Sequence, residues 1–201
     1  MIIMSNSEKI FKLIEKNNGY VTTREVVNNK IDKKFLSDMV KKGKIVRISR
    51  GYYGLPTYIE DEYYKIASKS KNAIFSMTTA LYLHNLSDRT PLVFHITLPA
   101  GYSGTLQKEK RVVINYAKRD LLDLGAIEMT SPFGMNIKVY DVERTICDII
   151  KYKNKVDAEI FRKALKNYIK CKNKNLSKLA KYAKIMNIEK KVSEYMEVLL
   201  Q

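Results

Sequence analysis

Apolar residues recur at helical spacing in three short segments of the first third of the chain. The first segment follows Ser7, which we expect to cap a helix, and stops at the Asn-Asn-Gly sequence of residues 17–19. The second covers residues 24–29 and follows two threonines, either of which can cap it. The third extends from Asp32, which can cap it, to about residue 42. We expect the inward face of the third helix to be formed by Phe35, Leu36, Met39 and Val40. The pattern predicts three short helices.

Strand-forming residues follow the third helix. Residues 44–55 contain two short runs of this kind on either side of Arg50-Gly51, which predicts a hairpin with a tight turn. Three short helices followed by a hairpin predict a winged helix-turn-helix domain over residues 1–57. In that fold the third helix has the size to enter a DNA major groove, which is about 12 Å wide.

The polar residues of this domain lie where contacts to DNA are expected. Hydroxyl groups at the start of the second helix and cations of the hairpin can hold phosphates, and polar side chains of the third helix can reach base edges. The candidate DNA-binding residues are Thr22, Thr23, Arg24, Lys33, Lys34, Ser37, Asp38, Lys41, Lys44, Arg47, Arg50 and Tyr52. Tyr52 can pack on a sugar or on the domain's own core. Two alternatives stay open: a helical domain with a solvated lysine face, and a winged helix that binds protein.

Residues 58–201 follow a boundary that we place after Pro56-Thr57. Strand-like runs cover residues 93–98, 112–116, 127–130 and 136–140. Helices are expected at residues 60–69 and 76–85 and after Asp141, which can cap a helix. Three amphipathic helices are expected beyond residue 157. These elements predict a C-terminal domain with a small β-sheet and several helices. The whole chain is therefore expected to be an α+β protein.

The basic residues are concentrated at the two ends of the chain. The formal net charge is +16. Residues 1–57 hold 12 basic and 5 acidic side chains (+7), residues 58–150 hold 11 of each, and residues 151–201 hold 14 and 5 (+9). The charge at the N-terminal end coincides with the predicted groove-facing surface, which favours DNA binding. The C-terminal helices place outward Lys166, Lys170, Lys172, Lys174, Lys178, Lys181 and Lys184. This lysine face is either solubilising or a binding surface for RNA, DNA or an acidic partner.

Candidates for catalysis are few. We expect the two histidines, His84 and His95, to be hydrogen-bonded in structural roles, and the charged set Glu143, Arg144 and Asp148 to form a solvated or half-buried ion network. The sequence has no nucleophile elbow, phosphate-binding glycine loop or metal-ligand spacing. No enzymatic activity, metal or cofactor is therefore expected.

The cysteine content and the apolar runs of the sequence bear on the protein's location in the cell. Two cysteines are too few for a disulfide framework, and we expect both to be reduced thiols on helices. No run of about 18 apolar residues and no signal peptide are found, so the protein is expected to be cytoplasmic and not membrane-bound.

Four blocks of sequence resemble one known family. They cover residues 48–53 (Ile-Ser-Arg-Gly-Tyr-Tyr), residues 76–91 with Ala-Leu-Tyr-Leu-His, residues 95–99, and residues 139–148 with Glu-Arg-Thr-Ile-Cys-Asp. In this order they resemble the AbiEi antitoxins of type IV toxin–antitoxin systems, which act in abortive infection and phage defence. The likeness covers roughly residues 5–150, and beyond 150 only the basic helical character agrees.

The resemblance implies an antitoxin and autorepressor with two domains. Its N-terminal winged helix would bind inverted repeats in its own promoter. Its C-terminal domain would counter a nucleotidyltransferase-like toxin without a stable complex. The resemblance also favours a monomer in solution, while the small DNA-contacting surface of one module favours two copies on the repeat. The alternative is an unrelated winged-helix transcriptional regulator with a ligand- or partner-sensing C-terminal domain.

Overall fold

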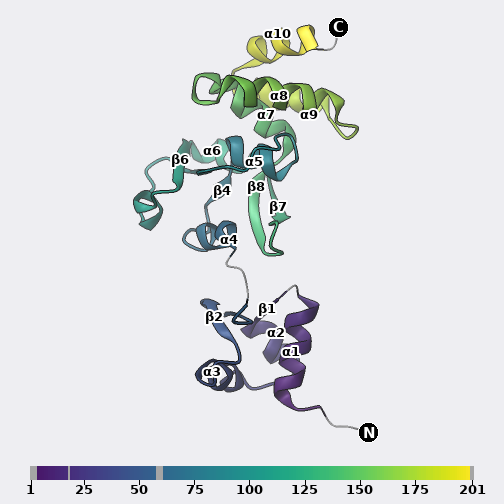
Figure 1. The fold of residues 1–201 in the computed structure, drawn as a ribbon. Helices are drawn as coiled ribbons and strands as arrows, with labels where there is room; N and C mark the ends of the chain where they lie inside the picture. Colours follow the sequence, from purple (N-terminus) through teal and green to yellow (C-terminus); the bar gives the residue numbers. More distant parts are fainter. Residues whose placement is uncertain (1–3, 18, 58–60, 200–201) are drawn as a thin grey trace. The chain divides into compact units, whose positions relative to one another are not determined.

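The computed structural model describes residues 4–17, 19–57 and 61–199. It divides into two compact units (Figure 1). The N-terminal unit comprises Met1–Ser68 with Pro132–Met135, and the C-terminal unit comprises Lys69–Ser131 with Asn136–Gln201. The division falls later than the 57/58 boundary expected from the sequence, because helix α4 (Glu62–Ala67) groups with the N-terminal unit. Residue 18, within the expected end of the first helix, and residue 60, the expected start of α4, lie outside the described residues.

Three helices and a three-stranded sheet form the N-terminal unit up to residue 54. The helices are α1 (Asn6–Lys16), α2 (Thr23–Asn28) and α3 (Lys34–Lys41), and the strands are β1 (Tyr20–Thr22), β2 (Val46–Ser49) and β3 (Tyr52–Gly54). The sheet is antiparallel in the order β1-β3-β2. Gly51 turns between β2 and β3 with φ 83°, a backbone conformation that suits glycine. The predicted helices and hairpin are present. Tyr20 and Val21, which precede the second helix, form a third strand that pairs with β3.

Two details of these helices differ from the sequence predictions. Ser5 caps α1 instead of Ser7, because Glu8 lies three residues after Ser5 and completes a reciprocal capping box with it. Phe35 is 38% exposed, although it was expected to point inward. Successive helical residues are about 100° apart, so the stripe through Leu36 and Met39 leaves Phe35 beside the core. The core of this unit consists of Ile10, Ile14, Val21, Val26, Ile31, Leu36, Met39 and Ile45.

A five-stranded mixed sheet forms the base of the C-terminal unit. Its strands are β4 (Ile74–Phe75), β5 (Phe94–Pro99), β6 (Val112–Ala117), β7 (Ala126–Thr130) and β8 (Asn136–Tyr140), in the order β6-β5-β4-β8-β7. The β5–β6 and β4–β8 pairs are parallel, whereas β4–β5 and β7–β8 are antiparallel. The four strands expected from the sequence are present. The central strand β4 was missed, since two residues are too few for a periodic pattern.

Helices and short 3-10 turns complete the described part of the C-terminal unit. They are α5 (Met77–Leu83), α6 (Arg119–Leu122), α7 (Val142–Lys151), α8 (Ala158–Lys170), α9 (Leu176–Ile185) and α10 (Glu189–Leu199), with 3-10 turns η1 (Thr105–Lys108) and η2 (Lys153–Lys155). Figure 1 shows α7 between the sheet and the helices α8 to α10. Helix α7 packs on α5, α8, α9 and α10, and every residue from Glu143 to Ile150 is buried. The α+β class is therefore confirmed.

Candidate nucleic-acid interface

The outer face of α3 carries four of the candidate residues. Lys34, Ser37, Asp38 and Lys41 are all exposed, and their spacing of three and four residues places them on one side of the helix. Leu36 and Met39 are buried on the opposite side. The helix begins one residue later than expected: Lys33 takes the cap position, while the Asp32 carboxylate still accepts the Lys34 backbone N–H at 2.8 Å. Packing of Leu36 and Met39 in the core thus sets the orientation of α3, and its polar face is exposed to solvent.

The hairpin adds further exposed cations. Lys44, Arg47 and Arg50 are exposed before β2, within β2 and in the turn. Arg47 lies at an irregularity in the β2–β3 pairing, and its Nε lies 3.4 Å from the Ser49 carbonyl oxygen, to which it donates. Lys42, which was not among the candidates, is also exposed at the end of α3. These side chains extend the positive charge from α3 to the wing.

The two threonine hydroxyls at the start of α2 are used within the fold. Thr22 Oγ1 donates to Glu25 Oε2 at 2.8 Å and accepts the Glu25 backbone N–H at 3.1 Å. Thr23 donates both its N–H and its hydroxyl to the Gly51 carbonyl, at 2.8 and 3.3 Å. The Glu25 carboxylate therefore occupies the helix N-terminus, where a phosphate would otherwise fit. Arg24, the next residue in α2, is exposed, so its guanidinium is accessible to a phosphate.

Tyr52 belongs to an aromatic cluster inside the N-terminal unit. Its ring centroid lies 6.1 Å from that of Tyr20 and 4.9 Å from that of Tyr64, so it packs on protein. Burial raises the pKa of Tyr64, and a hydrogen bond with Tyr52 raises it further. The twelve candidates thus separate into three half-buried residues with partners in the fold, Thr22, Thr23 and Tyr52, and nine exposed ones.

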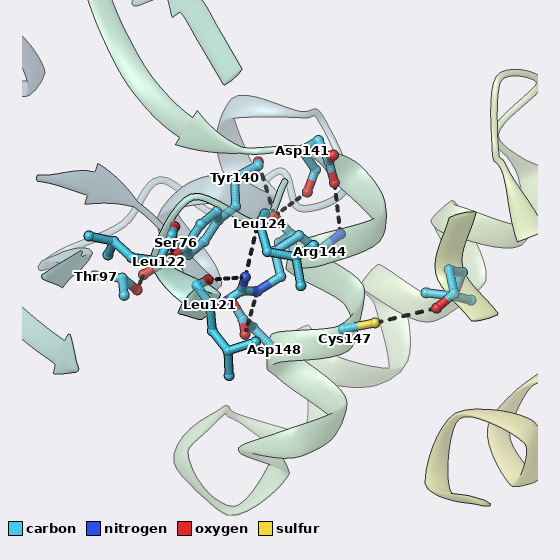
Figure 2. Close-up of polar contacts among 12 residues, drawn as sticks. Ser76, Thr97, Leu121, Leu122, Leu124, Tyr140, Asp141, Arg144, Cys147 and Asp148 are labelled. Carbon is cyan, nitrogen blue, oxygen red and sulfur yellow. Dashed lines mark hydrogen bonds and ion pairs between the residues drawn. The ribbon is translucent and has the colours of Figure 1, made fainter. Parts of the chain in front are cut away.

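The charged set of α7 is buried, contrary to the expectation of a solvated or half-buried network. Arg144 donates through Nε to Asp148 Oδ1 at 3.1 Å and through Nη1 to the carbonyls of Leu121 and Leu124 at 2.8 and 2.7 Å (Figure 2). Its guanidinium carbon lies 4.2 Å from the centroid of the Tyr140 ring. Burial raises the pKa of Asp148, and Arg144 opposes that rise. Arg144 thereby ties α7 to the segment after β6.

Lys178 was expected among the outward lysines of the C-terminal helices, but its ammonium binds carboxylates. It lies 2.8 Å from Asp141 Oδ2 and 3.8 Å from Glu143 Oε2. Both carboxylates are buried at the start of α7, and Tyr182 also donates to Asp141, at 3.0 Å. Asp141 caps α7 as expected, accepting the Arg144 N–H at 2.8 Å. The amphipathic pattern could place Lys178 beside these carboxylates only after α9 had been docked on α7.

The histidines occupy structural positions. His84 Nε2 lies 2.7 Å from the Tyr140 carbonyl oxygen. His95 is half-buried, its pKa is lowered by burial, and its Nδ1 has no hydrogen-bond partner among residues 4–17, 19–57 and 61–199. The expected side-chain hydrogen bond is therefore found for His84 and not for His95 Nδ1. Within the same residues no group of His, Cys, Asp and Glu is arranged to hold a metal ion.

Comparisons with known proteins agree with the N-terminal fold. Residues 8–56 match the model of a family described as transcriptional regulator, AbiEi antitoxin. The fold is similar to the crystal structure of the RV2827C protein from Mycobacterium tuberculosis, with a TM-score of 0.53 and 13% identity over 89% of this chain and 70% of that one. No match was found among curated proteins. No helix in the described part of the chain is long and apolar enough to cross a membrane. Residues 8–56 are thus similar to the AbiEi antitoxin family of transcriptional regulators.

Proposed function

We propose that this protein is the antitoxin of a type IV toxin–antitoxin system and that it represses its own promoter by binding inverted repeats. One observation carries the DNA-binding part of the proposal. Seven exposed cations, Arg24, Lys33, Lys34, Lys41, Lys44, Arg47 and Arg50, are displayed on one small winged-helix domain, on and around the open face of α3. Asp38 is the single acidic residue among the candidates.

Each part of this surface has a distinct role in the proposed complex. Helix α3 enters the major groove with Lys34, Ser37 and Lys41, and Asp38 accepts from a cytosine amino group. Arg47 and Arg50 of the wing bind phosphates, which sets the register of the domain on the duplex. Thr22, Thr23 and Tyr52 act indirectly, because they hold the wing turn and β3 in place. Affinity then comes from the cations and specificity from the α3 face.

Two copies bind each operator. One module covers little DNA, and an inverted repeat presents two equivalent half-sites about 34–36 Å apart for copies that occupy successive turns. The free protein is a monomer, so contacts on the DNA or bending of the duplex supply cooperativity.

The C-terminal domain, residues 58–201, counters a nucleotidyltransferase-like toxin without forming a stable complex with it. This part rests on the resemblance of the sequence blocks at residues 76–91, 95–99 and 139–148 to AbiEi antitoxins. The match of residues 8–56 to the family model also favours an antitoxin over an unrelated winged-helix regulator. The neighbouring reading frame provides a direct check: a nucleotidyltransferase-like gene directly downstream would support the proposal, and the absence of one would weaken it.

Footprinting on the DNA upstream of the gene tests the repressor role. The full chain should protect two inverted half-sites, and Lys34→Ala or Arg50→Ala should each weaken binding about tenfold, as expected for losing a charged contact. Lys9→Ala is the matched control, because Lys9 is an exposed lysine of α1 outside the interface. Undiminished binding by the two interface variants would move the interface elsewhere.

Co-expression with the neighbouring toxin tests the antitoxin role separately. Growth should be restored by the full chain and also by the Lys34→Ala and Arg50→Ala variants, because DNA binding and antitoxicity lie in different domains. Growth arrest in the presence of folded full-length protein would contradict the antitoxin role and leave the repressor role intact.

A further inference from the structure

A pocket of ≈ 400 Å³ lies within the C-terminal unit and contains none of the residues of the proposed DNA interface. It is bounded by β5, by β6 and the start of α6, by α7, and by the link between α9 and α10. Thr97, Leu121, Arg144 and Asp148, which Figure 2 labels, are part of its lining. The volume is within the range of small-molecule sites, which are commonly about 300–1,000 Å³.

One buried donor in the lining lacks a partner among the described residues. Asn115 pairs with Thr97 in the β5–β6 register, so the two side chains share one face of the sheet. The Asn115 Nδ2 is buried and has no acceptor among the residues that the structure describes, a rare state for a buried amide. Asp148 also lines the pocket, and its Oδ1 accepts from Arg144 Nε at 3.1 Å. The pocket therefore presents one buried donor without a partner and one carboxylate.

Two lysines give the pocket a positive charge. Lys118 is exposed at the end of β6, and Lys151 is half-buried near the end of α7. Arg144 and Asp148 neutralise each other, and Asp120 offsets one of the lysines, so the lining keeps a net charge of about +1. An anionic group such as a phosphate suits two ammonium groups in this setting.

The remaining lining is apolar and partly strained. Met77, Ile185 and Met186 offer flexible or branched apolar surface, and methionine sulfur packs favourably against flat rings. Met77 is a buried non-glycine residue with φ 51°, and Asn187 has φ 55°. Positive φ is costly for a methionine, and such strain clusters at ligand sites. A planar ring fits this wall better than a branched polar molecule.

We propose that this pocket binds a nucleotide. The base lies against Met77 and Met186, an acceptor on its edge receives the hydrogen bond from Asn115 Nδ2, and a base N–H donates to Asp148. The phosphate binds Lys118 and Lys151. A free nucleotide and the terminal nucleotide of an RNA strand present the same chemistry, and the site is independent of the proposed DNA interface.

Calorimetric titration of the full chain tests this site. The probes are AMP, GMP, CMP, UMP and a single-stranded RNA hexamer, with ribose 5-phosphate as the ligand that lacks a base. We expect at least one nucleotide to bind about tenfold more tightly than ribose 5-phosphate. Tighter binding of the hexamer than of every free nucleotide would identify an RNA end as the source, and the reverse order would identify a free nucleotide.

Two variants locate the site. Asn115→Ala and Lys151→Ala should each weaken nucleotide binding about tenfold. Lys181→Ala is the control, because Lys181 is an exposed lysine of α9 outside the lining. Asn115→Ala removes a buried amide without an acceptor, so its melting temperature should not fall, which shows that the variant folds. Absence of saturable binding, equal affinity for ribose 5-phosphate, or unchanged binding by both folded variants would overturn the proposal.

Discussion

The cations of α3 and the wing differ from Arg144 of α7 in everything that surrounds them. Lys34, Arg47 and Arg50 project from a small domain into solvent. Arg144 is 3% exposed and is held by a carboxylate, two backbone carbonyls and an aromatic ring. An exposed charge contributes little to folding and remains available to a polyanion, whereas a buried one is committed to the structure around it. The net charge of +16 therefore mixes cations with different roles.

The largest effect in this comparison is expected at Arg144. Arg144→Met leaves Asp148 as an uncompensated buried charge and removes the donor to Leu121 and Leu124, which should cost about 3–5 kcal/mol of stability. Urea unfolding of the C-terminal unit, followed by circular dichroism, measures this loss. Lys163→Met is a matched control, because it breaks the exposed Lys163–Asp88 ion pair and should leave the midpoint unchanged.

The double variant Arg144→Met with Asp148→Leu tests whether the unpaired Asp148 carboxylate causes the loss of stability. Replacing both members of a buried ion pair by apolar residues removes the uncompensated charge, so much of the lost stability should return. A double variant as unstable as Arg144→Met alone would mean that the carbonyls of Leu121 and Leu124, rather than Asp148, set the cost.

Lys178 is intermediate between the two extremes. Its ammonium binds buried Asp141, but the Lys178 side chain is 38% exposed, so solvent screens the interaction. Lys178→Ala should cost about 1 kcal/mol, measured by the same urea unfolding, because Tyr182 still donates to Asp141. Lys181→Ala on the same helix should cost nothing measurable. If Lys178→Ala lowered the free energy of unfolding as much as Arg144→Met, Lys178 would behave as a buried charge, contrary to this prediction.

The two thiols allow a comparison that does not depend on charge. Burial raises the pKa of the Cys147 thiol to about 12, whereas Cys171 at the end of α8 is half-buried. At pH 8, a thiol reagent should react with Cys171 first and with Cys147 only when the C-terminal unit opens. Fast reaction of two thiols in the folded protein would contradict the packing around α7. Cys171→Ser should leave only the slow reaction.

Local periodicity predicted most of the N-terminal unit. Its helices are short, but each has a clear apolar stripe, and the Arg50-Gly51 turn is flanked by strand-forming residues. The cations on α3 and the wing were also identifiable, because an exposed position needs no knowledge of distant contacts. The errors at Ser7, Phe35 and the start of α3 amount to a shift of one or two residues in a cap or a stripe, and the short strand β1 was missed.

The C-terminal unit was less predictable because its key contacts join distant residues. Glu143, Arg144 and Asp148 have the spacing of a solvated helix face, and nothing local indicates that carbonyls of residues 121 and 124 will surround Arg144. Lys178 matched the outward face of an amphipathic helix. The pocket could not be predicted either, since Asn115 and Asp148 are far apart in the sequence and line one pocket only in the folded C-terminal unit.

The salt dependence of operator binding tests the central claim most directly. If α3 and the wing neutralise about six phosphates, the logarithm of the association constant should fall with the logarithm of salt concentration at a slope near −5. The variant with Lys33, Lys34, Arg47 and Arg50 all replaced by Ala should bind far more weakly and give a slope shallower by about 4. An already shallow slope for the wild-type protein, or an unchanged slope for this variant, would contradict the proposed interface.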